Sequence, residues 1–256
     1  MSWRKLLVIA GAVLVPAGAK AQGACSMPTA ALAHPFAFVW INGVCKDASA
    51  LIAPLGNGTW TNAMTVRTSA GLVSLTATYH SDPFLTFGAT TTNSIAGTVT
   101  YAFLFGTPIT PGTYNTASST GGLTYTVAKT SGSVAPSAIY PTYISGYGTN
   151  GGSATNLGVD IGTATCSITT TTLNTCTQNF GVRTSTFAPA FYDNLEALLT
   201  YDQSGLQTVA SWSGAITLDY DNTIGNGNVV PEPATLGLFG IGLAGLGAVA
   251  RRRRRS

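Results

Sequence analysis

The sequence predicts an antiparallel β-sandwich of the jelly-roll kind between residues 22 and 222. Three observations predict it. Apolar and hydroxyl-bearing residues alternate with a period of two in several segments. The region is poor in charge and rich in Thr, Ser, Tyr and Val, which favours half-buried sheets over helices. Gly- and Pro-rich stretches separate the alternating segments, as loops do.

The first 21 residues have the pattern of a secretory signal peptide. Two basic residues precede an apolar run over 6–15, and Ala19 and Ala21 supply the small residues at positions −3 and −1 of a signal peptidase site. We therefore expect the mature chain to begin at Gln22. Two alternatives fit less well: a lipoprotein modified at Cys25 needs an aliphatic residue three positions earlier, and an uncleaved membrane anchor needs a longer apolar run.

The strands are expected where the alternation is clearest. Those segments are 73–79, 98–105, 123–127, 195–201 and 211–220. The longest turn-rich stretch, 131–156, and a second at 107–122 are expected to be loops, and residues 223–229 a flexible tether. No fixed-period repeat is visible, so the sequence disfavours a solenoid or a propeller.

The charge of the region between the two ends excludes one class of partner. From Gln22 to Val230 there are four basic and eight acidic residues, a net charge of −4, so the basic balance of the whole chain comes from its ends. Binding to a phosphate backbone needs a basic patch, and none is visible here. We therefore expect no nucleic-acid partner. About 200 residues are enough for one domain with a sizeable core.

All four cysteines, Cys25, Cys45, Cys166 and Cys176, lie in the part expected to be exported, where disulfides form by default. Of the three possible connectivities we favour Cys25 with Cys45 and Cys166 with Cys176, because each closes a local loop. A zinc site is the alternative, although no Cys-x-x-Cys spacing occurs. We predict no metal and no cofactor.

Candidates for catalysis and calcium binding are weak. His80, Ser81 and Asp82 are the residue types of a catalytic triad, but neighbours in an extended strand point to opposite faces and cannot converge, so we expect a strand end and a turn. Asp219, Asp221 and Asn222 could offer oxygen ligands to calcium, although they are fewer than a dedicated loop supplies. We therefore assign no catalytic residue.

Exposed aromatic side chains could form a carbohydrate-binding face. The candidates are spaced through the long loop or stand near turn residues: Tyr140, Tyr143, Tyr147, Trp40 and Trp60. Most aromatic side chains of a sandwich belong to its core, so burial in the core is the alternative.

The C-terminal 27 residues have three parts. Pro231, Glu232 and Pro233 belong to a Val-Pro-Glu-Pro motif, and residues 234–250 are apolar and uncharged. As a helix this stretch would be about 25 Å long, enough for a thin bilayer. Five arginines follow and should stay cytoplasmic: Arg251, Arg252, Arg253, Arg254 and Arg255. A buried core helix is the alternative for 234–250, but such a helix needs no arginine run after it.

This combination of secretion signal, Val-Pro-Glu-Pro, spanning segment and arginine cluster resembles the PEP-CTERM sorting signal of exosortase substrates in Gram-negative bacteria. The resemblance covers about a tenth of the chain. It implies that Pro231, Glu232 and Pro233 are the recognition motif and that 251–255 is the stop signal. It also implies that an exosortase, a cysteine transpeptidase-like enzyme of the inner membrane, cuts the chain near this motif.

We therefore expect a non-enzymatic, exported protein that ends on the cell surface or in the extracellular matrix, with a structural or adhesive role. Its expected partners are signal peptidase and the secretion machinery, transiently the inner membrane, and the exosortase. The resemblance also implies a genome that encodes exopolysaccharide production, which makes exopolysaccharide a further expected partner. Two other functions stay open: a carbohydrate-binding module and a secreted hydrolase.

Overall fold

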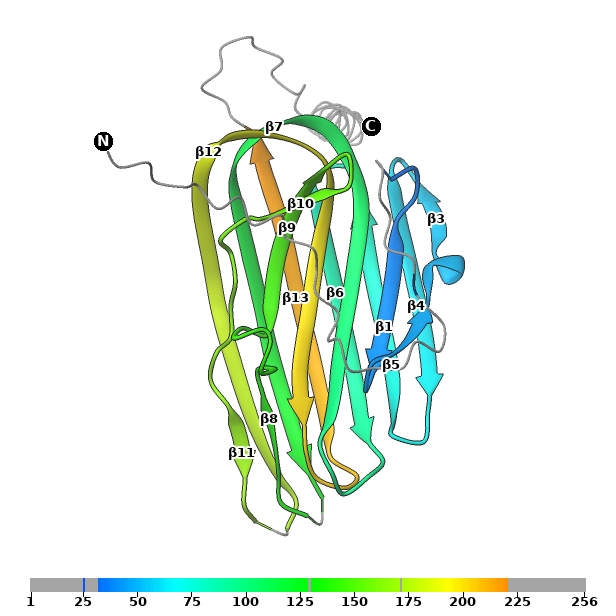
Figure 1. Cartoon of the computed structure of the whole chain (residues 1–256), viewed down its shortest axis with the longest axis vertical. Helices are drawn as coiled ribbons and strands as arrows, with labels where there is room; N and C mark the ends of the chain where they lie inside the picture. Colours follow the sequence, from blue (N-terminus) through cyan, green and yellow to red (C-terminus); the bar gives the residue numbers. More distant parts are fainter. Residues whose placement is uncertain (1–24, 26–31, 129, 171, 221–256) are drawn as a thin grey trace, which may run out of the picture. The chain divides into compact units, whose positions relative to one another are not determined.

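The computed structural model describes residues 25, 32–128, 130–170 and 172–220 (Figure 1). These residues form antiparallel strands and a single 3₁₀ turn, η1 (Ser49–Leu51). The strands are β1 (Phe36–Ile41), β2 (Val44–Asp47), β3 (Ala53–Gly56), β4 (Thr59–Arg67), β5 (Gly71–His80), β6 (Phe84–Asn93), β7 (Val99–Val127), β8 (Gly132–Ala135), β9 (Ile144–Asn150), β10 (Ser153–Asn156), β11 (Cys166–Ile168), β12 (Asn174–Gln203) and β13 (Val209–Tyr220).

Two long strands, β7 with 29 residues and β12 with 30, pair with each other along almost their whole length. The register shifts near the middle, between Thr186 and Ala190 and again between Tyr192 and Asn194. Such bulges bend a strand. The β7–β12 ribbon accordingly curves over at one end of the molecule, so that its two halves belong to different layers (Figure 1).

Each half of the ribbon is extended by further strands into one layer. In the first layer, residues 101–106 of β7 pair with β1 and residues 194–199 of β12 pair with β9. In the second layer, residues 114–126 of β7 pair with β13, and β6, β5, β4 and β3 follow in that order. The predicted antiparallel sandwich is confirmed. The jelly-roll-like connectivity stays a prediction.

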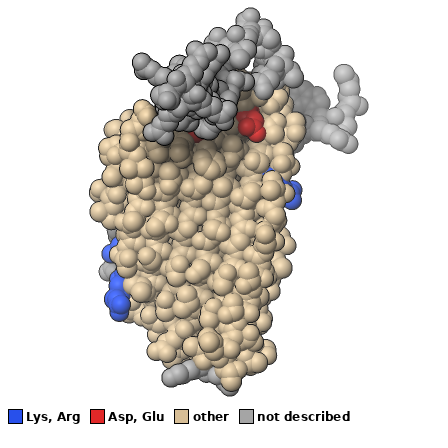
Figure 2. All heavy atoms as spheres, turned by 180° about the vertical axis from the view of Figure 1, so that it is seen from behind, with Lys and Arg blue, Asp and Glu red and all other residues tan. Residues whose placement is uncertain are grey.

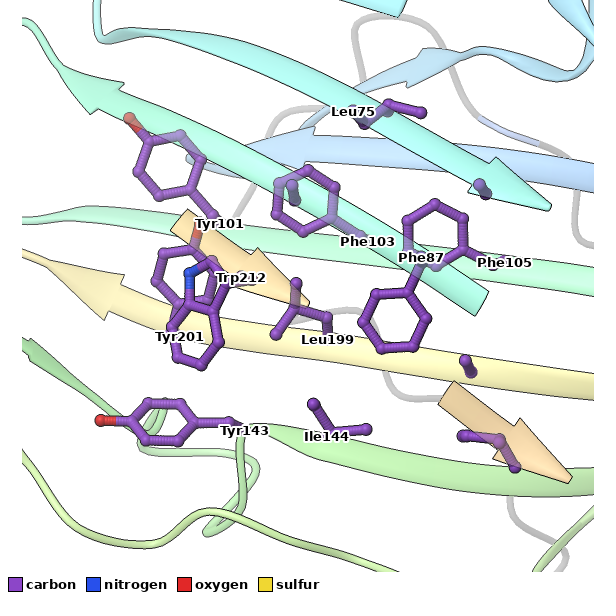
Figure 3. Close-up of a cluster of buried hydrophobic side chains, with 14 of the residues drawn as sticks. Leu75, Phe87, Tyr101, Phe103, Phe105, Tyr143, Ile144, Leu199, Tyr201 and Trp212 are labelled. Carbon is purple, nitrogen blue, oxygen red and sulfur yellow. The ribbon is translucent and has the colours of Figure 1, made fainter. Parts of the chain in front are cut away.

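The core lies between the two layers and is rich in aromatic side chains (Figure 3). Phe103 and Phe105, which the alternation predicts on one face of a strand, are 0% exposed. Contacts across the layers join Phe105 to Phe87 of β6, with ring centroids 5.0 Å apart, and Tyr201 of β12 to Trp212 of β13, at 4.6 Å. The period-two pattern therefore marks the inner face.

Both predicted loops are wrong in large part. Residues 107–122 continue β7, and the stretch 131–156 contains β8, β9 and β10. The reason is that β12 on one side and β13 on the other bond the backbone of β7, so the strand needs no apolar alternation of its own. The alternation of apolar and polar side chains therefore does not predict a strand that is stabilised by backbone hydrogen bonds to its neighbours.

Both favoured disulfides are present. Cys25 is linked to Cys45 of β2, with Cα atoms 6.0 Å apart, and Cys166 of β11 is linked to Cys176 of β12, with Cα atoms 6.1 Å apart. These separations lie within the usual range for a disulfide. The first link ties residue 25 to the first layer, and the second ties the short strand β11 to the long ribbon.

Candidate functional site

The first layer carries a second apolar cluster on its outer face. Phe36, Phe38, Leu104 and Leu198 are buried there together with Cys45. Successive residues of a strand point to opposite faces, so these side chains face away from the main core. The cluster is covered in turn by partly buried residues, among them Trp40, Tyr140 and Tyr147, so its margin is the first place to look for a site.

A small cleft of about 70 Å³ opens beside this cluster. Trp40 and Tyr140 are the two aromatic side chains that line it. The other lining residues are small, aliphatic or hydroxyl-bearing: Gly43, Thr100, Ala102, Leu104, Ser137, Ile139, Leu198 and Thr200. A cleft with aromatic walls and a few hydroxyl groups suits a small ligand with one apolar face.

The register of strands β1, β7 and β12 brings three of the lining residues together. Trp40 of β1 lies opposite Ala102 of β7, and Ala102 lies opposite Thr200 of β12, so the three side chains share a face. The small Ala102 leaves room beside the indole. Tyr140 comes from the segment between β8 and β9, where its backbone N–H donates to the carbonyl of Ser137 at 3.2 Å. We name this site the Trp40–Tyr140 cleft.

Two titratable side chains elsewhere on the same outer face, Glu196 and Tyr147, are shielded from water. Burial raises the pKa of Glu196 to about 7, and the carboxyl-bearing side chain is 8% exposed. The pKa of Tyr147 is raised as well, mainly by burial and to a smaller extent by the nearby Asp160 and Tyr140. At the opposite end, Asp202 accepts a 2.6 Å hydrogen bond from the Thr100 hydroxyl. The charged groups thus lie at the margins of the apolar cluster.

The structure brings together some of the predicted aromatic residues and separates the others. Trp40, Tyr140 and Tyr147 all pack against the second cluster. Tyr143 is 0% exposed in the main core, where its hydroxyl lies 3.0 Å from the carbonyl oxygens of both Val134 and Ala164 and can donate its one proton to either. Trp60 of β4 is partly buried and packs against the main core. The expectation of a sugar-binding role is therefore wrong for Tyr143, whose ring is buried in the core, and stays a prediction for the partly buried Trp60.

His80 and its neighbours lie as the sequence predicts, at the end of β5 and in the turn that follows. The Nδ1 atom of His80 is 3.3 Å from the Thr59 hydroxyl oxygen, and its ring packs on Phe84 with centroids 5.4 Å apart. Among the described residues no three His, Cys, Asp or Glu side chains are grouped to hold a metal ion. Asp219 is exposed at the end of β13, and its possible partners Asp221 and Asn222 lie outside the described residues.

The predicted signals at the two ends also lie outside the described residues. They are the signal peptidase site at Ala19, Ala21 and Gln22, the motif at Pro231, Glu232 and Pro233, the apolar stretch 234–250 and the arginines 251–255. Across 32–128, 130–170 and 172–220, no helix has the length and apolarity that a membrane span requires.

Several solved structures are similar to this chain, all at about 10% identity. The enzymatically active domain of tailspike protein 4 from bacteriophage CBA120 is 10% identical over 62% of this chain and 19% of its own, with a TM-score of 0.28. TmCBM61 in complex with β-1,4-galactotriose is 9% identical over 63% and 88%, with a TM-score of 0.22. A CBM4 structure is 10% identical over 76% and 100%, with a TM-score of 0.23. These scores are too low to assign a shared fold.

The sequence comparisons concern the C-terminal end. No curated protein sequence matches the chain. The profile of the PEP-CTERM protein-sorting motif matches residues 229–255, which include Pro231, Glu232, Pro233, the apolar stretch and the five arginines. Residues 229–255 of this chain therefore match the PEP-CTERM protein-sorting motif.

Proposed function

We propose that this protein is exported, is processed by an exosortase, and then has a structural or adhesive role at the cell surface or in the extracellular matrix, among exopolysaccharide. The observation that supports the proposal is the sorting motif at 229–255. Such a motif implies export and processing, and it leaves the work of the β-sandwich to be argued from the described residues.

The β-sandwich fits the proposed destination. Its two disulfides suit an oxidising compartment outside the cytoplasm. The region has few charges and many hydroxyl groups, so it can lie among neutral polymers without strong attraction to polyanions. No catalytic residue is assigned, and we propose that the protein is not an enzyme.

The proposed route has three steps. The secretion machinery exports the chain, and signal peptidase cuts it between Ala21 and Gln22. The apolar stretch 234–250 then holds it in the inner membrane, with the arginines at 251–255 on the cytoplasmic side. An exosortase reads Pro231, Glu232 and Pro233 and separates the sandwich from the tail.

The sorting step is tested by Glu232→Ala in a host that contains an exosortase. This change leaves the apolar stretch and the arginines intact, so insertion should be unaffected while recognition of Pro-Glu-Pro is lost. We expect the variant to stay in the inner membrane fraction at full mature length, whereas the native chain loses its tail and leaves that fraction. The measurement is an immunoblot of separated membrane, periplasmic and extracellular fractions.

Asn228→Ala is the matched control, because Asn228 lies just before the matched motif. It should be processed as the native chain is. Equal release of the Glu232→Ala variant and the native chain would refute the sorting proposal and leave the tail as a simple membrane anchor.

A second candidate function is that of a carbohydrate-binding module, which the Trp40–Tyr140 cleft favours. A sugar ring could place its C–H face on Trp40 or Tyr140 while the Thr100 and Thr200 hydroxyls bond its oxygens. Trp40→Ala should then abolish binding of oligosaccharides, measured by calorimetry. A secreted hydrolase would need an acid pair or a triad, and the side chains that line this cleft are apolar, aromatic or hydroxyl-bearing.

A further inference from the structure

The outer face of the second layer carries rows of hydroxyl groups. Residues that pair in register on neighbouring strands share a face and lie about 4.8 Å apart. One such row crosses six strands, from β12 to β4, with a hydroxyl on every strand: Thr177, Thr124, Ser211, Thr90, Ser74 and Thr65. A second row, four residues along, contains Thr120, Ala215, Thr86, Thr78 and Thr61.

Between these two rows lies a row of mostly small side chains: Gly122, Ser213, Gly88, Thr76 and Ala63. Two adjoining depressions mark the position of this row. One, of about 730 Å³, includes Gly122 and Ser213 in its lining, and the other, of about 360 Å³, includes Gly88 and Ala63. Thr86 lines both. Together they form a shallow channel across the strands, which we name the hydroxyl groove.

The dimensions of the hydroxyl groove fit an extended polymer. The row of small side chains crosses five strands, which gives four spacings of about 4.8 Å, so the groove is about 19 Å long. Its two flanking rows are four residues apart along each strand, which places them about 13 Å from each other. This is a long, narrow, open surface. It is larger and more open than the Trp40–Tyr140 cleft on the opposite layer.

The chemistry of the groove selects a neutral ligand. No Lys, Arg, Asp or Glu occurs in the three rows, and Figure 2 shows a broad face, opposite the view of Figure 1, on which charged side chains lie only near the margins. A charged polymer would lose hydration here without meeting a counter-charge. Each Ser or Thr hydroxyl both donates and accepts a hydrogen bond, as sugar hydroxyls do.

Part of the hydroxyl array is already ordered. The side-chain oxygens of Thr90 and Ser211 are 3.2 Å apart, and those of Thr65 and Ser74 are 3.5 Å apart, each pair on neighbouring strands. Ordered groups lose less conformational entropy when a ligand binds. We propose that the hydroxyl groove binds a single chain of a neutral polysaccharide, laid across the strands. This inference rests on the proposed adhesive function and gives that function a ligand class.

The test fills the groove with one side chain. Ser213 is exposed on β13 at its centre, so Ser213→Arg adds bulk and charge there without touching the core. Ser153→Arg, the same change at an exposed position of β10 in the first layer, is the matched control. If Ser213→Arg fails to fold, Thr76→Lys on β5 replaces it.

The full chain is used in a detergent without sugar headgroups. Its binding is measured by affinity electrophoresis against mixed-linkage β-glucan, β-1,4-galactan, galactomannan and the neutral exopolysaccharide of its own strain, with alginate as the anionic comparison. We expect at least one neutral polymer to bind, Ser213→Arg to weaken this binding about tenfold or more, and Ser153→Arg to leave it within about twofold.

Three outcomes would overturn the inference. The first is that no neutral polymer binds, or that alginate binds equally well. The second is that Trp40→Ala abolishes binding and Ser213→Arg does not, which would assign the ligand to the Trp40–Tyr140 cleft. The third is that Ser213→Arg dissociates a dimer of the native chain, which would make this face a contact between two copies. Processing of the Glu232→Ala variant is scored separately, so failure of the groove and failure of sorting are distinguishable.

Discussion

Replacing Phe103 with Ala is the most direct test of the sandwich, because this ring lies at the centre of the core. Phe103 is 0% exposed, and its ring centroid is 6.4 Å from that of Phe105 and 6.3 Å from that of Tyr201. A buried aromatic side chain removes about 150–250 Å² from water, worth about 4–6 kcal/mol at 25 cal/mol per Å². The methyl group of Ala keeps about 1 kcal/mol of this, so we expect a loss of about 3–5 kcal/mol.

Urea unfolding followed by tryptophan fluorescence measures the change, since Trp212 is buried in the same core. The midpoint should fall while the dependence on urea concentration stays constant, because the surface exposed by unfolding hardly changes. Phe191→Ala is the matched control: this ring of β12 is 48% exposed and should cost less than about 1 kcal/mol. If Phe103→Ala costs no more than Phe191→Ala, the register of the core strands is wrong.

Two further predictions concern the disulfides and pH. Removing the Cys166–Cys176 pair by double substitution with Ser should lower the free energy of unfolding by about 2.7 kcal/mol, and removing Cys25–Cys45 should lower it by about 3.3 kcal/mol, because the loops span 10 and 20 residues. Urea midpoints test this, and a larger loss for the shorter loop would contradict it. Burial raises the pKa of Glu196 from 4.5 in the unfolded chain to about 7 in the folded protein. The folded protein therefore holds the proton more tightly, and this stabilisation is fully present below about pH 4.5 and is lost as the pH rises through 7. The free energy of unfolding should fall by on the order of 3 kcal/mol over this range. In the native protein the urea midpoint should therefore fall between about pH 4 and 8. Glu196→Gln should remove this dependence on pH, and an unchanged dependence would show that another group causes it.

The sequence predicted the strands that bury one face and missed those that depend on their neighbours. Phe103 and Trp212 stand in alternating segments, because a half-buried strand imposes a period of two. Residues 107–122 contain Pro108, Pro111 and paired glycines, so they look like a loop, yet β12 pairs with this stretch of β7, and β13 pairs with it from Tyr114 onward. Backbone pairing between distant segments leaves no local trace in side-chain pattern.

The sequence predicted which residue types could form the Trp40–Tyr140 cleft, but not which of them come together. Trp40 and Tyr140 are 100 positions apart, and strand register with the β8–β9 connection brings them to one cleft. Tyr143 stands three residues from Tyr140 but points into the core, a direction that the composition of a Gly- and Tyr-rich segment does not indicate. Local proximity did predict the two disulfides, because each closes a short loop, with sequence separations of 20 and 10 residues.

The position of β13 has a mechanical consequence for the proposed step in which the C-terminal tail holds the chain in the inner membrane. This strand is the last that the structure describes, and it lies in the middle of the second layer, bonded to β6 on one side and β7 on the other. A pull along β13 would load both ladders in shear, so many hydrogen bonds share the force at once. A strand at the edge of the layer, pulled sideways, would instead lose its bonds one after another. Tension applied at the C-terminal end of β13 would therefore meet two hydrogen-bonded ladders instead of one.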